Sequence, residues 1–517
     1  MILENFRNRL SKIFAKMTGK ISEDSLQSIP LPQAPPSEMH SLQRKCDSVT
    51  PKNKDRDPYF FQIGFDFGTS YSKAVVRDIN RNHAWVYVVP FGTKFPDFLI
   101  PTVVVYKNGM FERHVDTGLL YPGGGLYHLK MALEKAALGK QDAPIFSEYK
   151  RILGNNSPNN PVQIAKLAVI YFLSTTFSEI IHSIKQKFPD YGAMQEDQIA
   201  VNMAIPVANI STKSVCQLFE SVLNIAWKLG QEDDFIHNHL SVSDLLLKVR
   251  DLKKMIQKEG NNELCHVYPE VSANVQAFLR SPASSPDVST IYFLSDTGAG
   301  TVDQSVFTYA GKNGRKLNYF SAHVFPIGSS LIERIACGDE TNETNLEYWR
   351  KKKESGSNDQ RIKSAKEKVG KKVKTDSEKS LHDTQKCLWL KDSLERNIKF
   401  IFSGGGHIKF PYQNAVIEAY QKYLDTKRPP IVTSMPRPND LDIPKGHEHR
   451  MNRLYVAYGL AFLFAELQGW TSPSENIISD ETISNPPPKN REIKYCLCKG
   501  LLPECPSCHG SGQILEL

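Results

Sequence analysis

Apolar runs of strand length alternate with longer stretches of helical periodicity along most of the chain. Four short runs rich in β-branched and aromatic residues are separated by turns, at residues 60–65, 73–76, 85–89 and 102–106. Runs of this length and composition predict strands, and their close spacing predicts an antiparallel meander.

The rest of the chain mixes the two periodicities. Helical spacing of apolar residues predicts helices at 162–188, 211–229 and 452–467. Strand-like runs occur at 198–204, 290–294, 304–309 and 397–402. This alternation of strands and helices favours an α/β fold with mixed sheets.

The N-terminal 20 residues have the pattern of an amphipathic helix. Apolar residues recur at helical spacing within residues 2–19, and lysines and arginines occupy much of the remaining positions. Such a helix binds an anionic membrane surface or the groove of a partner protein, or it docks on the body of its own chain. Residues 21–58 are rich in serine, proline and charge and predict a flexible linker.

Bulk composition excludes several classes of protein. The 517 residues are enough for more than one core, and 40% hydrophobic with 23% charged residues is ordinary for a globular protein. The net charge of +8 is spread over local clusters, which argues against a dedicated nucleic-acid binder. We expect no membrane-spanning helix and no secretory signal, and the scattered cysteines fit a reducing cytoplasm.

Two charged or polar stretches interrupt the pattern. Residues 339–396 are dense in lysine, glutamate, aspartate and serine, and we interpret them as solvated helix with a mobile segment. Residues 470–493 contain a run of three prolines and predict a second linker.

The candidate chemistry begins with two glycine-bearing turns, each preceded by an aspartate and flanked by strands. The first turn places Asp66 before Gly68, Thr69 and Ser70. The second places Asp296 before Gly298, Gly300 and Thr301, with Asp303 just beyond, as the sequence of residues 295–303 shows. Glycine allows backbone N–H groups to approach an anion, and the hydroxyls add donors. The carboxylates would repel phosphate directly, so we expect them to hold a hydrated Mg²⁺ that bridges phosphates.

A third glycine run, Gly404 to Gly406, follows the strand predicted at 397–402. Because glycine has no side chain, this run suits close approach of the backbone to a flat base or a ribose.

Seven segments, in this order, resemble the motifs of the actin-like ATPase superfamily, and within it the ATPase domain of DnaK-type heat-shock chaperones. They are residues 63–70, 199–206, 268–273, 294–307, 325–330, 401–411 and 456–461. The resemblance implies an α/β fold of two lobes, each a mixed sheet of ribonuclease H type with insertions, over residues 59–469. Lobe I would cover about 59–285 with a returning helix at about 452–469, and lobe II about 286–451.

The resemblance also implies roles for individual residues. Asp66, Asp296 and Asp303 would organise Mg²⁺ and its waters, and Glu270 would orient or deprotonate the attacking water with help from Asp296. ATP or ADP would be held by the residues of the turns and of two further loops, namely Gly68, Thr69, Ser70, Gly298, Gly300, Thr301, Gly328, Gly405, Gly406 and Lys409. Phosphoryl transfer needs mainly positioning and charge neutralisation, so this set is chemically sufficient. A carboxylate at a helix start on the surface is the alternative interpretation of Glu270, since Pro269 precedes it.

The chain departs from the family pattern at several points. Ala299 stands where the second turn of the family has a glycine, and Lys409 stands where an arginine stacks on adenine. Lys130 and Lys150 are both candidates for the family's catalytic lysine. No peptide-binding domain or helical lid follows residue 469, so the resemblance implies nucleotide switching without the usual binding of client peptides.

The last segment, residues 494–517, contains four closely spaced cysteines, Cys496, Cys498, Cys505 and Cys508. Four thiolates at this spacing suit tetrahedral Zn²⁺, and the second pair resembles one repeat of the DnaJ-type zinc finger. The alternative is a set of free thiols on a frayed tail.

Three functions are left open by the sequence. The first is an ATPase that acts as a Mg²⁺-ATP-dependent conformational switch and recruits protein partners through the zinc tail and the N-terminal helix. The second is a scaffold or sensor that binds nucleotide with little or no hydrolysis. The third is a small-molecule kinase of the same superfamily.

Overall fold

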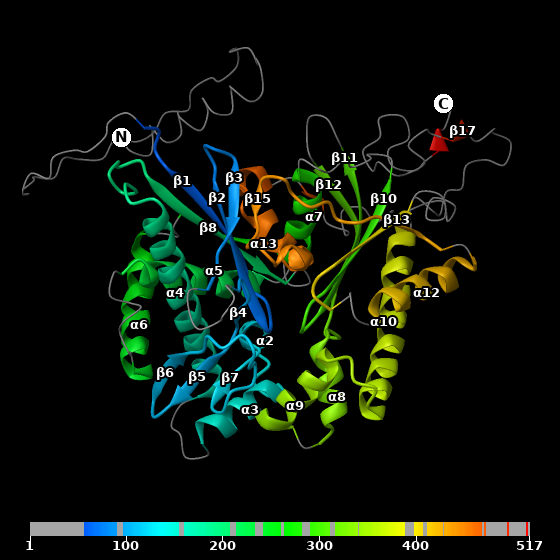
Figure 1. Cartoon of the computed structure of the whole chain (residues 1–517), viewed down its shortest axis with the longest axis horizontal. Coiled ribbons are helices and arrows are strands. Elements are labelled where there is room, and N and C mark those ends of the chain that lie inside the picture. The colour runs from blue at the N-terminus through cyan, green and yellow to red at the C-terminus, as the bar shows by residue number, and fades with distance from the viewer. Residues whose placement is uncertain are drawn as a thin grey trace, which may run out of the picture. The chain divides into compact units, whose positions relative to one another are not determined.

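The computed structural model describes residues 56–89, 97–154, 160–206, 213–232, 241–259, 263–281, 290–310, 316–339, 341–387, 398–406, 411–427, 429–467, 470–471, 494–495 and 513–514. The predicted N-terminal helix and almost all of the first linker lie outside these residues. The described body is a mixed α/β structure built on two large β-sheets (Figure 1).

The first sheet contains three strands of the predicted meander as antiparallel neighbours, whereas the fourth run, residues 102–106, falls on β5 Val104–Lys107 in a separate small sheet. Its strands follow the order β15-β3-β2-β1-β8-β9, with β4 paired to β2. β1, β2 and β3 are antiparallel, whereas β8 lies parallel to β1 and β9 lies parallel to β8. The bounds are β1 Phe60–Asp66, β2 Tyr71–Asp78, β3 His83–Val86, β4 Ile100–Pro101, β8 Gln198–Ile205, β9 Cys265–Pro269 and β15 Leu441–Asp442.

The second sheet follows the order β14-β13-β10-β11-β12-β16. β10, β11 and β12 are antiparallel, and β13 lies parallel to β10. The bounds are β10 Ile291–Thr297, β11 Val302–Ala310, β12 Lys316–Phe325, β13 Ile398–Ser403, β14 Ile431–Val432 and β16 Trp470–Thr471.

The two sheets share one strand order. Taken from the far strand of each meander, the first runs β3-β2-β1-β8-β9 and the second runs β12-β11-β10-β13-β14. In both, an antiparallel three-stranded meander is extended by strands parallel to its first strand. The molecule therefore repeats one topology in its two halves, although no short-period repeat is visible in the sequence.

Helices and a small sheet complete the first half. The helices are α2 Leu129–Ala137, α3 Pro144–Leu153, α4 Pro161–Lys187, α5 Lys213–Gly230 and α6 Val242–Glu259, and the small sheet contains β5 Val104–Lys107, β6 Met110–Arg113 and β7 Gly125–Leu126. α4 is long and apolar enough to cross a membrane by composition, but 94% of its most apolar window is buried in the protein. It is therefore packed as a core helix of this half.

Two helices lie between the sheets, α7 Glu270–Arg280 and α13 Tyr455–Leu460 (Figure 1). They cross closely because Gly459 has no side chain: a Cβ there would lie 1.9 Å from the carbonyl oxygen of Ala273. Gly64 of β1 approaches α13 in the same way, since its Cβ would lie 2.0 Å from the oxygen of Ala457. These contacts attach the central helices to the sheet strand that carries Asp66.

The prediction of a single helix over residues 452–467 is wrong, because this part of the chain forms three short helices. They are the 3₁₀ helix η3 Glu448–Arg453, α13, and α14 Phe464–Leu467. The side-chain amide of Asn202 on β8 donates to the carbonyls of Leu460 and Phe462, at 2.9 and 2.8 Å. A side chain distant in sequence thus provides hydrogen-bond donors to the carbonyl groups at the end of α13.

The second half carries α8 Ser330–Cys337, α9 Glu343–Glu354, α10 Gln360–Lys386 and α12 Tyr412–Leu424. The charged stretch forms helices as predicted, but α10 is not simply solvated. Ile362, Ala365, Val369 and Val373 are fully buried and line the side that packs on α12 and β12. Apolar residues at intervals of three and four are sufficient for a buried stripe even in a strongly charged sequence. Residues 340 and 388–396 of this stretch lie outside the described residues.

Candidate functional site

A cavity of about 870 Å³ lies between the two halves and receives residues from both. From the first half it is lined by the turn after β1 and by Lys130 and Glu270. From the second half it is lined by the turn after β10, by Gly404 to Gly406 and by side chains of α8 and α9. The two aspartate-glycine turns, about 230 residues apart in sequence, therefore face one space.

The two turns are built alike. In the first hairpin Asp66 pairs across the ladder with Lys73, and in the second Asp296 pairs with Asp303. Each aspartate thus lies at or next to the end of one strand, and the residue seven positions later lies opposite it near the start of the return strand. Lys73 donates to the Oδ2 atom of Asp66 at 2.5 Å, whereas the second hairpin places two carboxylates opposite each other.

Asp66, Glu270 and Asp296 line the cavity, and Asp303, which does not line it, adjoins Glu270 and Asp296. Asp66, Asp296 and Asp303 are 3%, 6% and 3% exposed, and each has a buried Oδ1 atom without a hydrogen-bond partner. Glu270, Asp296 and Asp303 each bring a carboxylate oxygen within 4.8 Å of the others. Buried oxygens of like charge at this spacing are stable only if a cation or protons neutralise them.

The electrostatics agree with that requirement. Burial, together with the charges of Glu270 and Asp66, raises the pKa of Asp296 to about 7. Burial and the charge of Glu270 raise the pKa of Asp303 well above its usual range. In the absence of a cation, protons are therefore held by this cluster near neutral pH.

Lys130 lies in the first turn of α2 and forms an ion pair with Glu270, the first residue of α7. Burial alone would lower the pKa of Lys130, but the charges of Glu270 and Asp66 outweigh burial and raise it. Lys130 is thus a cation held inside the acidic cluster. Lys150, the other lysine candidate, is exposed on α3.

His128 turns the chain into α2 just before Lys130. It adopts left-handed backbone dihedrals, with φ of 58°, and its buried ring packs edge-on against Tyr121 and Tyr127. Burial, with a smaller contribution from Arg334, lowers the pKa of His128 to about 3, so the ring is neutral. An uncharged, tightly packed residue therefore fixes the start of the helix that carries Lys130.

Most of the predicted nucleotide-contacting residues line the cavity, namely Gly68, Thr69, Ser70, Gly298, Thr301, Gly405 and Gly406. Gly300 instead packs against the other turn, because its Cβ would lie 2.5 Å from the hydroxyl of Thr69. Gly328 supports the second turn from behind, and its N–H donates to the oxygen of Gly300 at 3.1 Å. Ser329 and Ser330, which follow Gly328, line the cavity and donate their N–H groups to that same turn.

The third glycine run is attached to the other two elements. Gly406 donates to the oxygen of Thr297 at 2.9 Å, and Gly404 is bonded in both directions to Asn452 on η3. Gly404 has φ of +84°, and a Cβ there would lie 2.2 Å from Asp296 Oδ1, so only glycine fits. Lys409 lies outside the described residues, as do Cys496, Cys498, Cys505 and Cys508.

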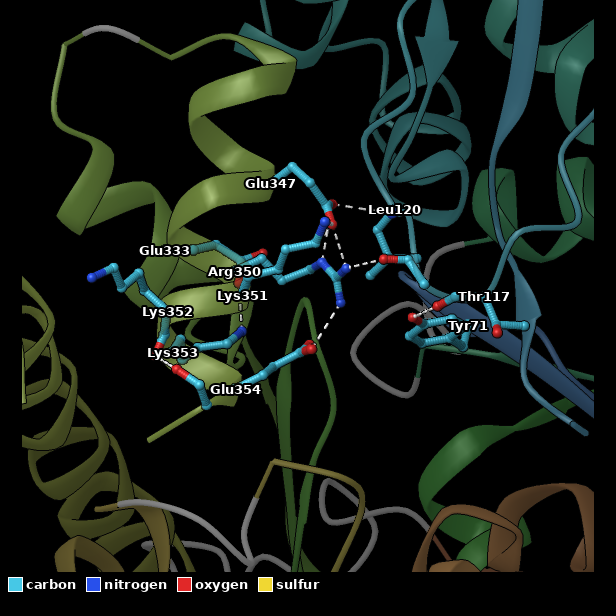
Figure 2. Close-up of polar contacts among 12 residues, drawn as sticks. Tyr71, Thr117, Leu120, Glu333, Glu347, Arg350, Lys351, Lys352, Lys353 and Glu354 are labelled. Atoms are coloured by element: carbon cyan, nitrogen blue, oxygen red, sulfur yellow. Dashed lines mark hydrogen bonds and ion pairs between the residues drawn. The ribbon is translucent and has the colours of Figure 1, made fainter. Parts of the chain in front are cut away.

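Polar contacts join the halves along one wall of the cavity (Figure 2). Arg350 of α9 donates to the oxygen of Gly118 at 2.5 Å and pairs with Glu347 and Glu354. Glu347 accepts the N–H of Leu120 at 3.2 Å (Figure 2). Because Gly118 and Leu120 belong to the first half, these bonds hold α9 across the cavity.

A second set of contacts continues this wall. The hydroxyl of Tyr121 donates to buried Glu333 at 2.6 Å, and Lys353 pairs with the same carboxylate. Arg334 of α8 forms an ion pair with Glu148 of α3 at 3.0 Å. The two halves are therefore joined by several charged contacts, each of which can break without disturbing either sheet.

A scan against models of known protein families finds no match to this chain. A search of curated proteins finds no match either. The site must therefore be interpreted from its own geometry.

The arrangement offers glycine turns that line the cavity, a group of carboxylates suited to a hard divalent cation, the buried Lys130 and the partly buried Lys73. Oxygen-rich sites of this kind suit Mg²⁺ or Mn²⁺ together with phosphate groups. Sequence reasoning missed Lys73, although its place seven residues after Asp66 in a hairpin was a usable signal. It also missed Arg350 and Arg453, which no local motif marks.

Proposed function

We propose that this protein is a Mg²⁺-ATP-dependent conformational switch with ATPase activity, resembling the ATPase domain of DnaK-type chaperones without a peptide-binding domain. The observation that carries the proposal is the Lys130–Glu270 pair, which lies in the same cavity as both aspartate-glycine turns. A charged pair of this kind, beside a metal-type carboxylate cluster and phosphate-type turns, is suited to phosphoryl transfer to water.

The repeated sheet order supports the proposal at the level of the fold. An actin-like ATPase would consist of two related halves that enclose a nucleotide, and the two sheets here have equivalent strand orders. The first hairpin of each half supplies one aspartate-glycine turn to the cavity.

The carboxylate cluster fits Mg²⁺. Its donors are oxygens, and three of them are buried without a partner. Burial, and then the charge of Glu270, raises the pKa values of Asp296 and Asp303 despite the nearby lysines. Asp66, Asp296 and Asp303 would hold the ion, partly through water. The bound ion would neutralise phosphate charge and orient the phosphates.

The chain's own residues would then perform the following tasks. Backbone N–H groups of the two turns bind phosphate oxygens, with Thr69 and Thr301 adding hydroxyl donors. Lys130 and Lys73 balance negative charge. Glu270, held by Lys130, orients the attacking water and accepts its proton. Closure of the two halves excludes bulk water from these groups.

The decisive test measures phosphate release and nucleotide binding by the native chain and by Glu270→Gln. We expect Mg²⁺-dependent hydrolysis by the native chain, and a loss of at least about 100-fold in kcat for the variant with ATP binding retained. Glu367→Gln, on the exposed side of α10, is the matched control and should behave as the native chain.

Other outcomes identify the alternatives. Tight binding of Mg²⁺-ATP by the native chain with no turnover above background would contradict the ATPase and indicate a nucleotide-binding scaffold or sensor. Strong acceleration by a sugar or polyol, with a phosphorylated product, would indicate a small-molecule kinase.

A further inference from the structure

Arg453 is a cation that lines the cavity and has no role in the proposed hydrolysis of ATP. It is the last residue of η3 and lies half-buried beside the third glycine run. Within the described residues its guanidinium forms no hydrogen bond or ion pair. Arg450, one turn earlier on the same element, pairs with Asp97 at 3.2 Å. The two arginines thus differ, since only one has a carboxylate partner.

Gly405 explains how Arg453 is held. A Cβ on Gly405 would lie 2.9 Å from both Cζ and Nε of Arg453, so the guanidinium rests directly against the glycine backbone. A guanidinium is planar, so support by a flat stretch of backbone leaves its remaining surface available to the cavity it lines.

The environment of Arg453 is unfavourable for a charge without a ligand. Burial, and then the charge of Arg450, lowers the pKa of Arg453. A half-desolvated cation beside another cation gains free energy when a planar π-system or an acceptor group contacts it. The carboxylates of the metal-type cluster do not serve this purpose, since none of them pairs with Arg453 among the described residues.

We propose that Arg453 binds the purine base of the nucleotide, stacking on the base with Gly405 behind the guanidinium. This inference rests on the proposed nucleotide site and adds the residue that recognises the part of the ligand remote from the phosphates. Cation–π contacts of arginine with a desolvated ring are strong enough to change affinity measurably. It assigns the role to a side chain on η3, in a segment separate from the glycine run.

The test separates the base from the phosphates by using two probes, Mg²⁺-ATP and Mg²⁺-tripolyphosphate, in calorimetric binding to the full chain. We expect Arg453→Ala to weaken Mg²⁺-ATP about tenfold and to leave Mg²⁺-tripolyphosphate within about twofold. Arg453→Lys keeps the charge without the plane and should lose a smaller part of the ATP affinity.

Gly405→Ala provides a test that leaves the charge untouched. Its new methyl group must displace the guanidinium, so ATP affinity should fall as in Arg453→Ala while tripolyphosphate affinity is kept. Arg437→Ala is the control, because Arg437 is exposed and does not line the cavity. If Arg453→Ala unfolds, the lysine and Gly405 variants carry the test.

The results distinguish this inference from the proposed function. Unchanged ATP affinity in the folded variants, or an equal loss for both probes, would overturn the role of Arg453 and leave the nucleotide site intact. Failure of the native chain to bind either probe would overturn both.

Discussion

At the scale of single residues, the cluster of carboxylates controls how the protein responds to pH and metal. The folded-state pKa of Asp296, about 7, lies above the usual value of an aspartate, and that of Asp303 is raised as well. At pH values between the usual pKa of an aspartate and these raised values, the folded protein therefore binds more protons than the unfolded chain. Without a cation, the cluster's contribution to stability is largest at low pH and falls as pH rises through about 7.

This direction of the pH dependence gives a prediction for thermal unfolding. At pH 8, adding Mg²⁺ should raise the melting temperature by a few degrees, because the ion replaces the lost protons; at pH 5.5 it should raise it much less. Asp296→Asn should increase the metal-free melting temperature at pH 8 and reduce the gain from Mg²⁺. The interpretation is wrong if Mg²⁺ has the same effect at both pH values in the native chain.

Residues also show what the sequence could and could not predict. Asp66 and Asp296 could be singled out because a hairpin turn with glycines is a local signal, whereas Glu270 was singled out only through the family resemblance of residues 268–273. Lys130 could not be chosen over Lys150, since only the tertiary structure brings the start of α2 to Glu270. Arg453 was not predictable, because its contact with Gly405 joins separate segments of the chain.

At the scale of elements, prediction succeeded where the periodicity was long and failed where distant side chains decide the ends. α4 and α5 agree with the predicted ranges within two residues. The two-residue strands β14 and β15 carry too little pattern to be recognised, yet they extend both sheets. The break after α13 depends on Asn202, which is more than 250 residues away.

The C-terminal element offers a separate prediction. β17 Lys494–Tyr495 and β18 Gln513–Ile514, which flank the four cysteines in sequence, pair as an antiparallel ladder. We expect the purified chain to contain about one zinc ion, and Cys505→Ser with Cys508→Ser to remove it, as measured by elemental analysis. Cys216→Ser, on α5, should retain the metal. Zinc kept at full occupancy by the double variant would contradict this site.

At the scale of the whole molecule, the contacts of α8 and α9 with the first half should control the escape of nucleotide. Arg350→Ala removes the bond to Gly118 and frees Glu347, so the halves should separate more easily. We expect release of a fluorescent nucleotide to accelerate by about tenfold in stopped-flow measurements, since charge-assisted bonds contribute about 1.5–3 kcal/mol each.

Two comparisons make this prediction specific. Lys352→Ala, a neighbouring cation that does not line the cavity, should release nucleotide at the native rate. Tyr121→Phe removes one bond to Glu333 and should accelerate release by a smaller factor. Equal release rates for the native chain and Arg350→Ala, with native melting temperatures, would show that these contacts do not hold the halves together.

The repeated sheet order has a consequence for orientation. Two halves with one topology, facing each other across a cavity, would form a site with nearly equivalent sides if their hairpins were identical. They differ at the position seven residues after the aspartate, where one hairpin has Lys73 and the other has Asp303. This difference gives the equivalent ladder positions of the two hairpins opposite charges. A ligand with unlike ends therefore has one favoured way to enter, and the polarity of the cleft originates in a difference between the two copies.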